Sequence, residues 1–160
     1  MSDPTHVDRD PLHLYAPFRA KLLAIIEQVN HETHGKHGVD RWIIEEGLRT
    51  QARQDWLWAQ GRTRPGPIVT HIRVSNHSSG LAADCYPVDA RGQILWSVAD
   101  EIWEQFAHCV RANGMQSGRD FPTIHPGSTF VDNPHVEPPA ALRGLWGPKA
   151  AAWLKGQGLA

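Results

Sequence analysis

A histidine and an aspartate seven residues apart stand in the most informative stretch of the chain, Ser75 to Asp84 (SNHSSGLAAD). Gly80 between them allows a sharp turn, and the small apolar residues that follow are typical of a buried strand that carries Asp84 inward. Imidazole and carboxylate are both ordinary zinc ligands. The pattern therefore makes His77 and Asp84 candidate ligands of one metal ion, although such a pair on its own is more often a coincidence.

A second segment, Asp132 to Glu137 (DNPHVE), offers a third ligand and a base. A catalytic zinc site takes three protein ligands and a water molecule, and His135 would complete the three. Asp132, three residues earlier, could act as general base, because zinc lowers the pKa of water and a carboxylate can accept the proton. Glu137 either orients a ligand histidine from outside the metal's coordination sphere or is an exposed strand residue.

Four segments taken together resemble one family. They are Gly47–Thr50 (GLRT) with Gln54, Leu57–Thr70 (LWAQGRTRPGPIVT), Ser75–Asp84 and Asp132–Glu137. In content and order they look like the zinc peptidases of phage endolysins, which cleave the L-alanyl-D-glutamate bond of peptidoglycan. These are similar to the D-alanyl-D-alanine carboxypeptidases and the VanY-like vancomycin-resistance peptidases.

The resemblance implies one zinc ion per chain, held by His77, Asp84 and His135, with Asp132 as the catalytic base. It also implies that Arg49 binds a substrate carboxylate or stabilises the oxyanion; a structural ion pair is the alternative for this residue. Ser75 is expected to bind substrate or shape the loop, since attack by water needs no serine nucleophile.

The chain departs from the family pattern at two places. Trp58 stands where the family often has tyrosine. The Gly-Gly-x-Trp segment that usually precedes the last motif is replaced by Gln116–Phe121, and a longer loop with His125, Pro126 and Gly127 follows. We expect this 116–129 region to border the cleft and to affect substrate preference, with His125 on the surface rather than against substrate.

These residues must be positioned by an α+β fold. Apolar periodicity predicts helices over about 14–30 and 94–113, Thr50 is a candidate N-cap for a helix over 51–60, and Pro148 is expected to open a last helix over 148–156. Strands are expected near 42–44, 82–88 and 135–137. The resemblance implies a Hedgehog/D,D-peptidase-like domain, with a small antiparallel sheet flanked by helices. We expect residues 1–160 to form this one catalytic domain, with its motifs between about 40 and 140 and no separate cell-wall-binding domain.

Composition limits the other possibilities. The chain has 160 residues, 41% hydrophobic and 21% charged, with a net charge of −1, so it is typical of a globular protein and has no basic field that would favour nucleic acid. Cys85 and Cys109 are too few for a disulfide framework, and we expect buried free thiols. The polar start, MSDPTHVDRDP, is unlike a signal peptide, and no apolar run is long enough to insert into a membrane.

The functional hypothesis is a zinc metallopeptidase that acts on the peptide stem of peptidoglycan, as an L-alanyl-D-glutamate endopeptidase. The resemblance makes it a phage endolysin with antimicrobial, cytolytic activity. It would be a monomer made in the host cytoplasm, and a holin would give it access to the cell wall in the periplasm. The alternatives are a D-alanyl-D-alanine carboxypeptidase or dipeptidase, and a non-catalytic zinc module that binds the wall.

Overall fold

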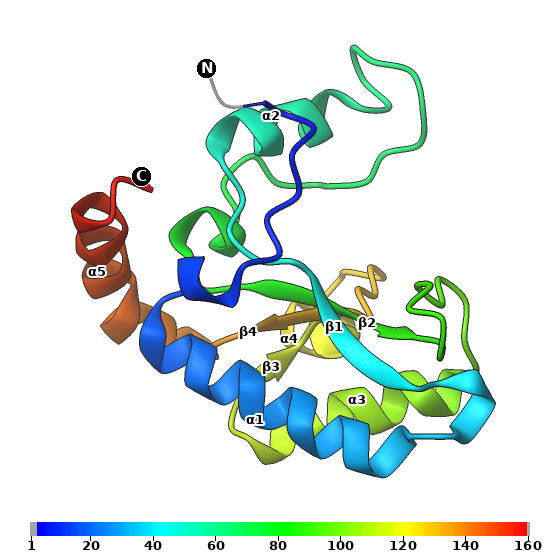
Figure 1. Ribbon diagram of the computed structural model, residues 1–160. Coiled ribbons are helices and arrows are strands. Elements are labelled where there is room, and N and C mark those ends of the chain that lie inside the picture. Colours follow the sequence, from blue (N-terminus) through cyan, green and yellow to red (C-terminus); the bar gives the residue numbers. More distant parts are fainter. Residues whose placement is uncertain (1–2, 160) are drawn as a thin grey trace.

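Four short strands form one antiparallel sheet at the centre of the computed structural model, which describes residues 3–159 (Figure 1). The strand order is β1-β2-β4-β3, and the strands are β1 (Arg41–Glu46), β2 (Ala83–Val88), β4 (His135–Glu137) and β3 (Gln116–Ser117). Alternate residues of a strand point to opposite faces. On β2 the buried Ala83 and Cys85 face one side, and Asp84 and Tyr86 face the other.

Two helices cover the first face of the sheet, α1 (Ala16–Thr33) and α3 (Asp100–Ala112), which pack against each other (Figure 1). The buried positions of α1 recur every three or four residues and form one apolar stripe; they are Phe18, Leu22, Ile25, Val29 and Thr33. Trp42 of β1 stacks on Phe106 of α3 with ring centroids 4.5 Å apart. The core therefore lies between the helices and one face of the sheet, which leaves the opposite face for a site.

The opposite face is bordered by α2 (Gln51–Ala59), a long segment over 60–74, and the short helix α4 (Phe121–Ile124). Thr50 caps α2, because its hydroxyl accepts a hydrogen bond from the Arg53 N–H. The connections within residues 3–159 also contain four short 3-10 helices: η1 (Pro11–His13), η2 (Lys36–Gly38), η3 (Asn76–Ser79) and η4 (Gly118–Asp120). The C-terminal helix α5 (Ala140–Gly156) follows β4.

The α+β class, the small antiparallel sheet and the flanking helices are confirmed, while several boundaries are corrected. The third helix begins at Asp100 rather than at 94, because Ile94 bridges Val88 and the Leu95 N–H donates to Pro87. Pro148 lies inside α5 and does not open it. The first helix is shifted to 16–33, and both β3 and α4 were not predicted.

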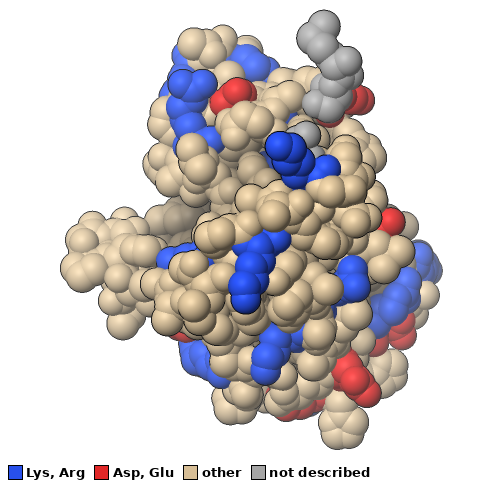
Figure 2. All heavy atoms as spheres, turned by 90° about the vertical axis from the view of Figure 1, so that its left-hand side faces the viewer, with Lys and Arg blue, Asp and Glu red and all other residues tan. Residues whose placement is uncertain are grey.

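The two cysteines are buried free thiols, as predicted. Burial raises the pKa of both thiols, which keeps them protonated. Within residues 3–159, no helix is both long and apolar enough to cross a bilayer. On the face drawn in Figure 2, Lys and Arg side chains are interspersed with Asp and Glu instead of forming a patch of one sign.

Candidate metal centre

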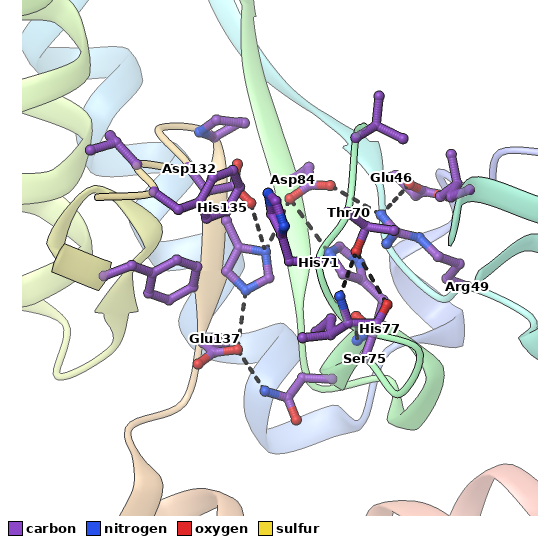
Figure 3. A pocket seen from close by; sticks show the side chains of 18 of the residues that line it. Glu46, Arg49, Thr70, His71, Ser75, His77, Asp84, Asp132, His135 and Glu137 are labelled. Carbon is purple, nitrogen blue, oxygen red and sulfur yellow. Dashed lines mark hydrogen bonds and ion pairs between the residues drawn. The ribbon is translucent and has the colours of Figure 1, made fainter. Parts of the chain in front are cut away.

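Three side chains converge on one point of the open sheet face (Figure 3). The Asp84 Oδ1 lies 3.4 Å from the His77 Nε2 and 3.2 Å from the His135 Nδ1, and one ligand atom of each residue lies within 4.8 Å of the others. For metal–ligand bonds of about 2.1 Å, neighbouring ligands of a tetrahedral site are about 3.4 Å apart. The donor set and its spacing therefore suit one zinc ion.

Backbone geometry brings the three residues together. Asp84 of β2 pairs directly with His135 of β4, so both side chains point to the same face of the sheet. His77 lies on η3, which ends at Gly80 in the left-handed region (φ 66°). A Cβ at Gly80 would also lie 3.3 Å from the His13 carbonyl oxygen. This is the sharp turn that the sequence required between His77 and Asp84.

In His77 and His135, the ring nitrogen that faces away from the metal point has a hydrogen-bond acceptor beside it. The Nδ1 of His77 lies 2.8 Å from the Gly47 carbonyl oxygen, and the Nε2 of His135 lies 3.1 Å from the Glu137 Oε2. Donation to these oxygens leaves the opposite nitrogen of each ring as a lone-pair donor, which is the tautomer that a metal needs.

Glu137 is buried, so it is not the exposed strand residue that the sequence left open. Its Oε2 also accepts from the Asn76 amide at 2.6 Å, and its Oε1 accepts from the Gln116 amide at 3.0 Å and from Arg143. These contacts fix the carboxylate that orients His135. Asn76, Gln116 and Arg143 were not predicted, because their contacts with Glu137 span three separate segments.

Asp132 lies beside the triad without being part of it. Its Oδ2 is 4.0 Å from the His135 Nδ1, and its side chain is 30% exposed. Burial and the nearby Asp84 carboxylate raise the pKa of Asp132 to about 6. A bound cation would favour the ionised form, so this carboxylate is suited to accept a proton near neutral pH.

The charges of the triad stabilise one another. Burial opposes ionisation of Asp84, but His77 and His135 outweigh that effect and hold the pKa of Asp84 well below its ordinary value. For His135, burial acts to lower the pKa, whereas hydrogen bonds to Asp84 and Glu137 raise it to about 10. The centre therefore attracts a positive charge, either a proton on His135 or a metal cation.

Arg49 lies at the edge of the centre with its guanidinium between two carboxylates. Its Nη2 donates to Glu46 at 2.5 Å and to Asp84 at 3.4 Å, and its Nη1 donates to Gln54 at 2.9 Å. Glu46 was not predicted as part of the site, although it directly precedes the Gly47–Thr50 motif. Ser75 caps η3, since its hydroxyl accepts from the His77 N–H at 3.3 Å, and it also lines the cleft.

The triad opens into a cleft of about 960 Å³ between two walls. One wall is the 68–72 part of the long segment, and the other is the 121–131 region with Phe121, His125 and Phe130. His71 and Phe130 meet across the cleft with ring centroids 5.6 Å apart. The 116–129 region therefore borders the cleft, as predicted, through Phe121 and the loop that follows it; His125 of this loop is exposed and lines the cleft.

No family model matches the chain. A curated relative, the peptidoglycan L-alanyl-D-glutamate endopeptidase CwlK of Bacillus subtilis (strain 168), is 33% identical over 104 residues. The match covers 59% of this chain and 59% of the relative, so the chain spans less than two thirds of the curated protein's length.

Two solved structures share the fold. The L-Ala D-Glu endopeptidase ChiX of Serratia marcescens superposes with a TM-score of 0.55 at 19% identity, over 87% of this chain and 90% of that protein. A point variant of the vancomycin-resistance D,D-pentapeptidase VanY, solved in complex with Zn(II), gives a TM-score of 0.52 at 17% identity, over 91% and 80% of the two chains. Together with the curated relative, they confirm the predicted resemblance to VanY-like zinc peptidases.

Proposed function

We propose that this chain, which resembles the VanY-like zinc peptidases, is a zinc-dependent hydrolase that cuts the L-alanyl-D-glutamate bond in the peptide stem of peptidoglycan. The observation that carries the proposal is the convergence of His77, Asp84 and His135 at the base of an open cleft, with the Asp132 carboxylate beside them. Three ligands and a neighbouring base are the composition of a catalytic rather than a structural zinc site.

When bound, zinc supplies Lewis acidity that polarises a peptide carbonyl and makes water more acidic. The Nε2 of His77, the Oδ1 of Asp84 and the Nδ1 of His135 would hold the ion. Asp132 would accept a proton from the attacking water at Oδ2 and deliver it to the nitrogen of the leaving amine. This transfer regenerates the carboxylate, so one residue serves as base and then as acid.

Arg49 would assist from the side of the cleft. Its Nη2 already donates to two carboxylates and its Nη1 to Gln54, so one Nη1 hydrogen is left for a substrate oxygen. A single charged donor can stabilise a developing oxyanion or bind a substrate carboxylate. Ser75 would contribute by fixing the backbone of η3 and by contacting substrate at the cleft wall.

The choice of bond is supported by the name of the curated relative and tested by product analysis. Purified muropeptides are incubated with the zinc-loaded protein, and with the same protein after removal of zinc by a chelator. An endopeptidase releases a stem with a new amino-terminal glutamate, only in the presence of zinc. Release of free D-alanine would instead establish the D-alanyl-D-alanine carboxypeptidase alternative. Zinc binding without hydrolysis of either bond would favour the non-catalytic wall-binding module.

For the biological role of this activity, we propose a phage endolysin that acts as a monomer on the cell wall after a holin opens the membrane. The support for this role is the resemblance of the four motifs to endolysin peptidases. The test is expression in bacteria with and without a co-expressed holin. Lysis that needs both proteins supports the role, whereas lysis by this chain alone would contradict the need for a holin. Size-exclusion chromatography with light scattering tests the monomer.

A further inference from the structure

A bulge in β1 places a second carboxylate opposite Asp84. The pairing with β2 runs regularly from Arg41 to Ile44 and then skips Glu45, so that Glu46 is the residue opposite Asp84. Directly opposite residues of an antiparallel pair point to the same face, and bulges commonly redirect a side chain next to a site. Two carboxylates placed in this way repel each other, so the arrangement needs a counter-ion.

Arg49 is that counter-ion, and its charge is directed mainly to Glu46. The Arg49 Nη2 is 2.5 Å from the Glu46 Oε2 but 3.4 Å from the Asp84 Oδ2. The Glu46 side chain is only 4% exposed and that of Arg49 is 10% exposed, so solvent screens this pair weakly. Figure 3 shows the guanidinium of Arg49 between the two carboxylates.

Glu46 is itself held from the other side. Its Oε1 accepts from the Arg53 Nε, and the Arg53 Nη1 lies 3.3 Å from the Pro4 carbonyl oxygen and 3.4 Å from that of Thr5. Gln54, which is fully buried, fixes the other nitrogen of Arg49 and donates to the Ile72 carbonyl oxygen at 2.7 Å. The guanidinium is therefore fixed on both of its terminal nitrogens.

We infer that Glu46 is a positioning residue of the metal centre, which acts through Arg49 to keep the negative charge of Asp84 available to the cation. The inference rests on the proposed zinc site. If Glu46 were neutral, Asp84 would be the one charged carboxylate among the described residues that Arg49 contacts directly. The guanidinium would then move toward Asp84, neutralise part of its charge and draw its Oδ1 away from the two histidines. Loss of an outer partner of this kind typically weakens metal affinity by about 10–100-fold.

The test compares Glu46→Gln with Glu45→Gln. Glu45 is the adjacent bulge residue, pairs with Arg9 at 3.0 Å and does not line the cleft, so it is a matched control for the loss of a carboxylate from β1. Zinc dissociation constants are measured by competition with a chromogenic chelator, and the melting temperature of each metal-free protein is recorded. We expect about tenfold or greater weakening for Glu46→Gln, and a change within about twofold for Glu45→Gln.

A conservative variant keeps the inference testable if Glu46→Gln does not fold. Glu46→Asp retains the charge but shortens the side chain, so its zinc affinity should fall between those of the wild type and Glu46→Gln. If Glu46→Gln does not fold, the comparison is with the wild type alone, and Glu46→Asp should bind zinc more weakly. Equal zinc affinity in the wild type and in the folded Glu46 variants would overturn the inference. Failure of the wild type to bind zinc at all would overturn the proposed function itself, so the two failures are distinguishable.

Discussion

Asp84 and His135 face each other across the β2–β4 ladder, with the Asp84 Oδ1 3.2 Å from the His135 Nδ1. Two of the three candidate ligands are thus held by paired strands, and only His77 depends on a loop. A site built on strands is held more precisely than one built on loops. The geometry of the centre therefore depends chiefly on the sheet register and on the turn that ends at Gly80.

His77→Ala should remove the ligand that comes from the loop. We expect zinc affinity to fall by more than about 100-fold, since a direct ligand should matter more than an outer partner. His125→Ala is the matched control, because His125 lines the same cleft but is not one of the three converging residues. Zinc content after dialysis against a weak chelator measures both. Unchanged zinc content in His77→Ala would remove His77 from the ligand set.

Much of this centre could be predicted from sequence because its candidate ligands lie in short motifs. Gly80, between His77 and Asp84, and Pro134, directly before His135, mark turns that can be recognised within one short segment of sequence. The placement of Glu46 beside Arg49 and opposite Asp84 is different in kind, because the β1 bulge that sets it arises from pairing with a distant strand. No local pattern in the sequence specifies such a register shift.

The helix boundaries that were wrong have a similar explanation. Apolar residues at 94, 95 and 98 continue the helical period of α3. The Leu95 N–H nevertheless donates to the Pro87 carbonyl oxygen, so this segment pairs with the end of β2 and is not part of the helix. At the other end, Gly144, Gly147 and Pro148 all have low helix propensity, yet α5 runs through them. In both places tertiary packing outweighs the local preference.

Asp132→Asn should separate catalysis from metal binding. The change keeps the size of the side chain but removes a proton acceptor, so peptide hydrolysis should fall by about 10²–10⁴-fold. Zinc content should stay at the wild-type level, because Asp132 lies outside the triad. Rates on purified muropeptides and zinc content are measured on the same samples. Asp120→Asn, which alters a partner of Arg111 on the surface, is the control. Full activity in Asp132→Asn would exclude this residue as the base.

Glu137→Gln should disturb the orientation of His135. The variant keeps one oxygen but loses the charge that Arg143 and two amides hold in place, so we expect zinc to bind about 10–100-fold more weakly. Glu104→Gln, on the exposed face of α3, should leave zinc affinity unchanged. Chelator competition measures both. An affinity for Glu137→Gln equal to that of the control would show that the hydrogen bond to His135 is dispensable.

Gly118→Ala should displace Asp132, the candidate base, without changing its carboxylate. A Cβ at Gly118 would lie 2.3 Å from the Asp132 carbonyl oxygen and 2.8 Å from the His135 Cβ. The backbone around Asp132 must therefore shift, at a cost of about 1–3 kcal/mol of unfolding free energy, and hydrolysis should fall with it. Gly144→Ala is the control, since a Cβ there meets no atom within 4 Å and alanine favours a helix by up to about 1 kcal/mol. Urea denaturation and activity assays measure both variants; equal stability would mean that the close approach is relieved cheaply.

Removal of zinc should lower the melting temperature by an amount that depends on zinc concentration. A ligand that binds only the folded state stabilises it by RT ln(1 + [L]/Kd), which is about 2.7 kcal/mol at a hundredfold excess over Kd. A low Kd is expected at this centre, because the carboxylates of Asp84 and Asp132 both lie beside the point where a cation would sit. Differential scanning fluorimetry across a zinc titration gives the shift, and Mg²⁺ at the same concentrations is the control, since it prefers six oxygen ligands. His77→Ala should lose most of the zinc-dependent shift, and its metal-free melting temperature should also fall, because the buried imidazole bonds the Gly47 carbonyl oxygen. A shift that persists in this variant would place the stabilising ion elsewhere on the molecule.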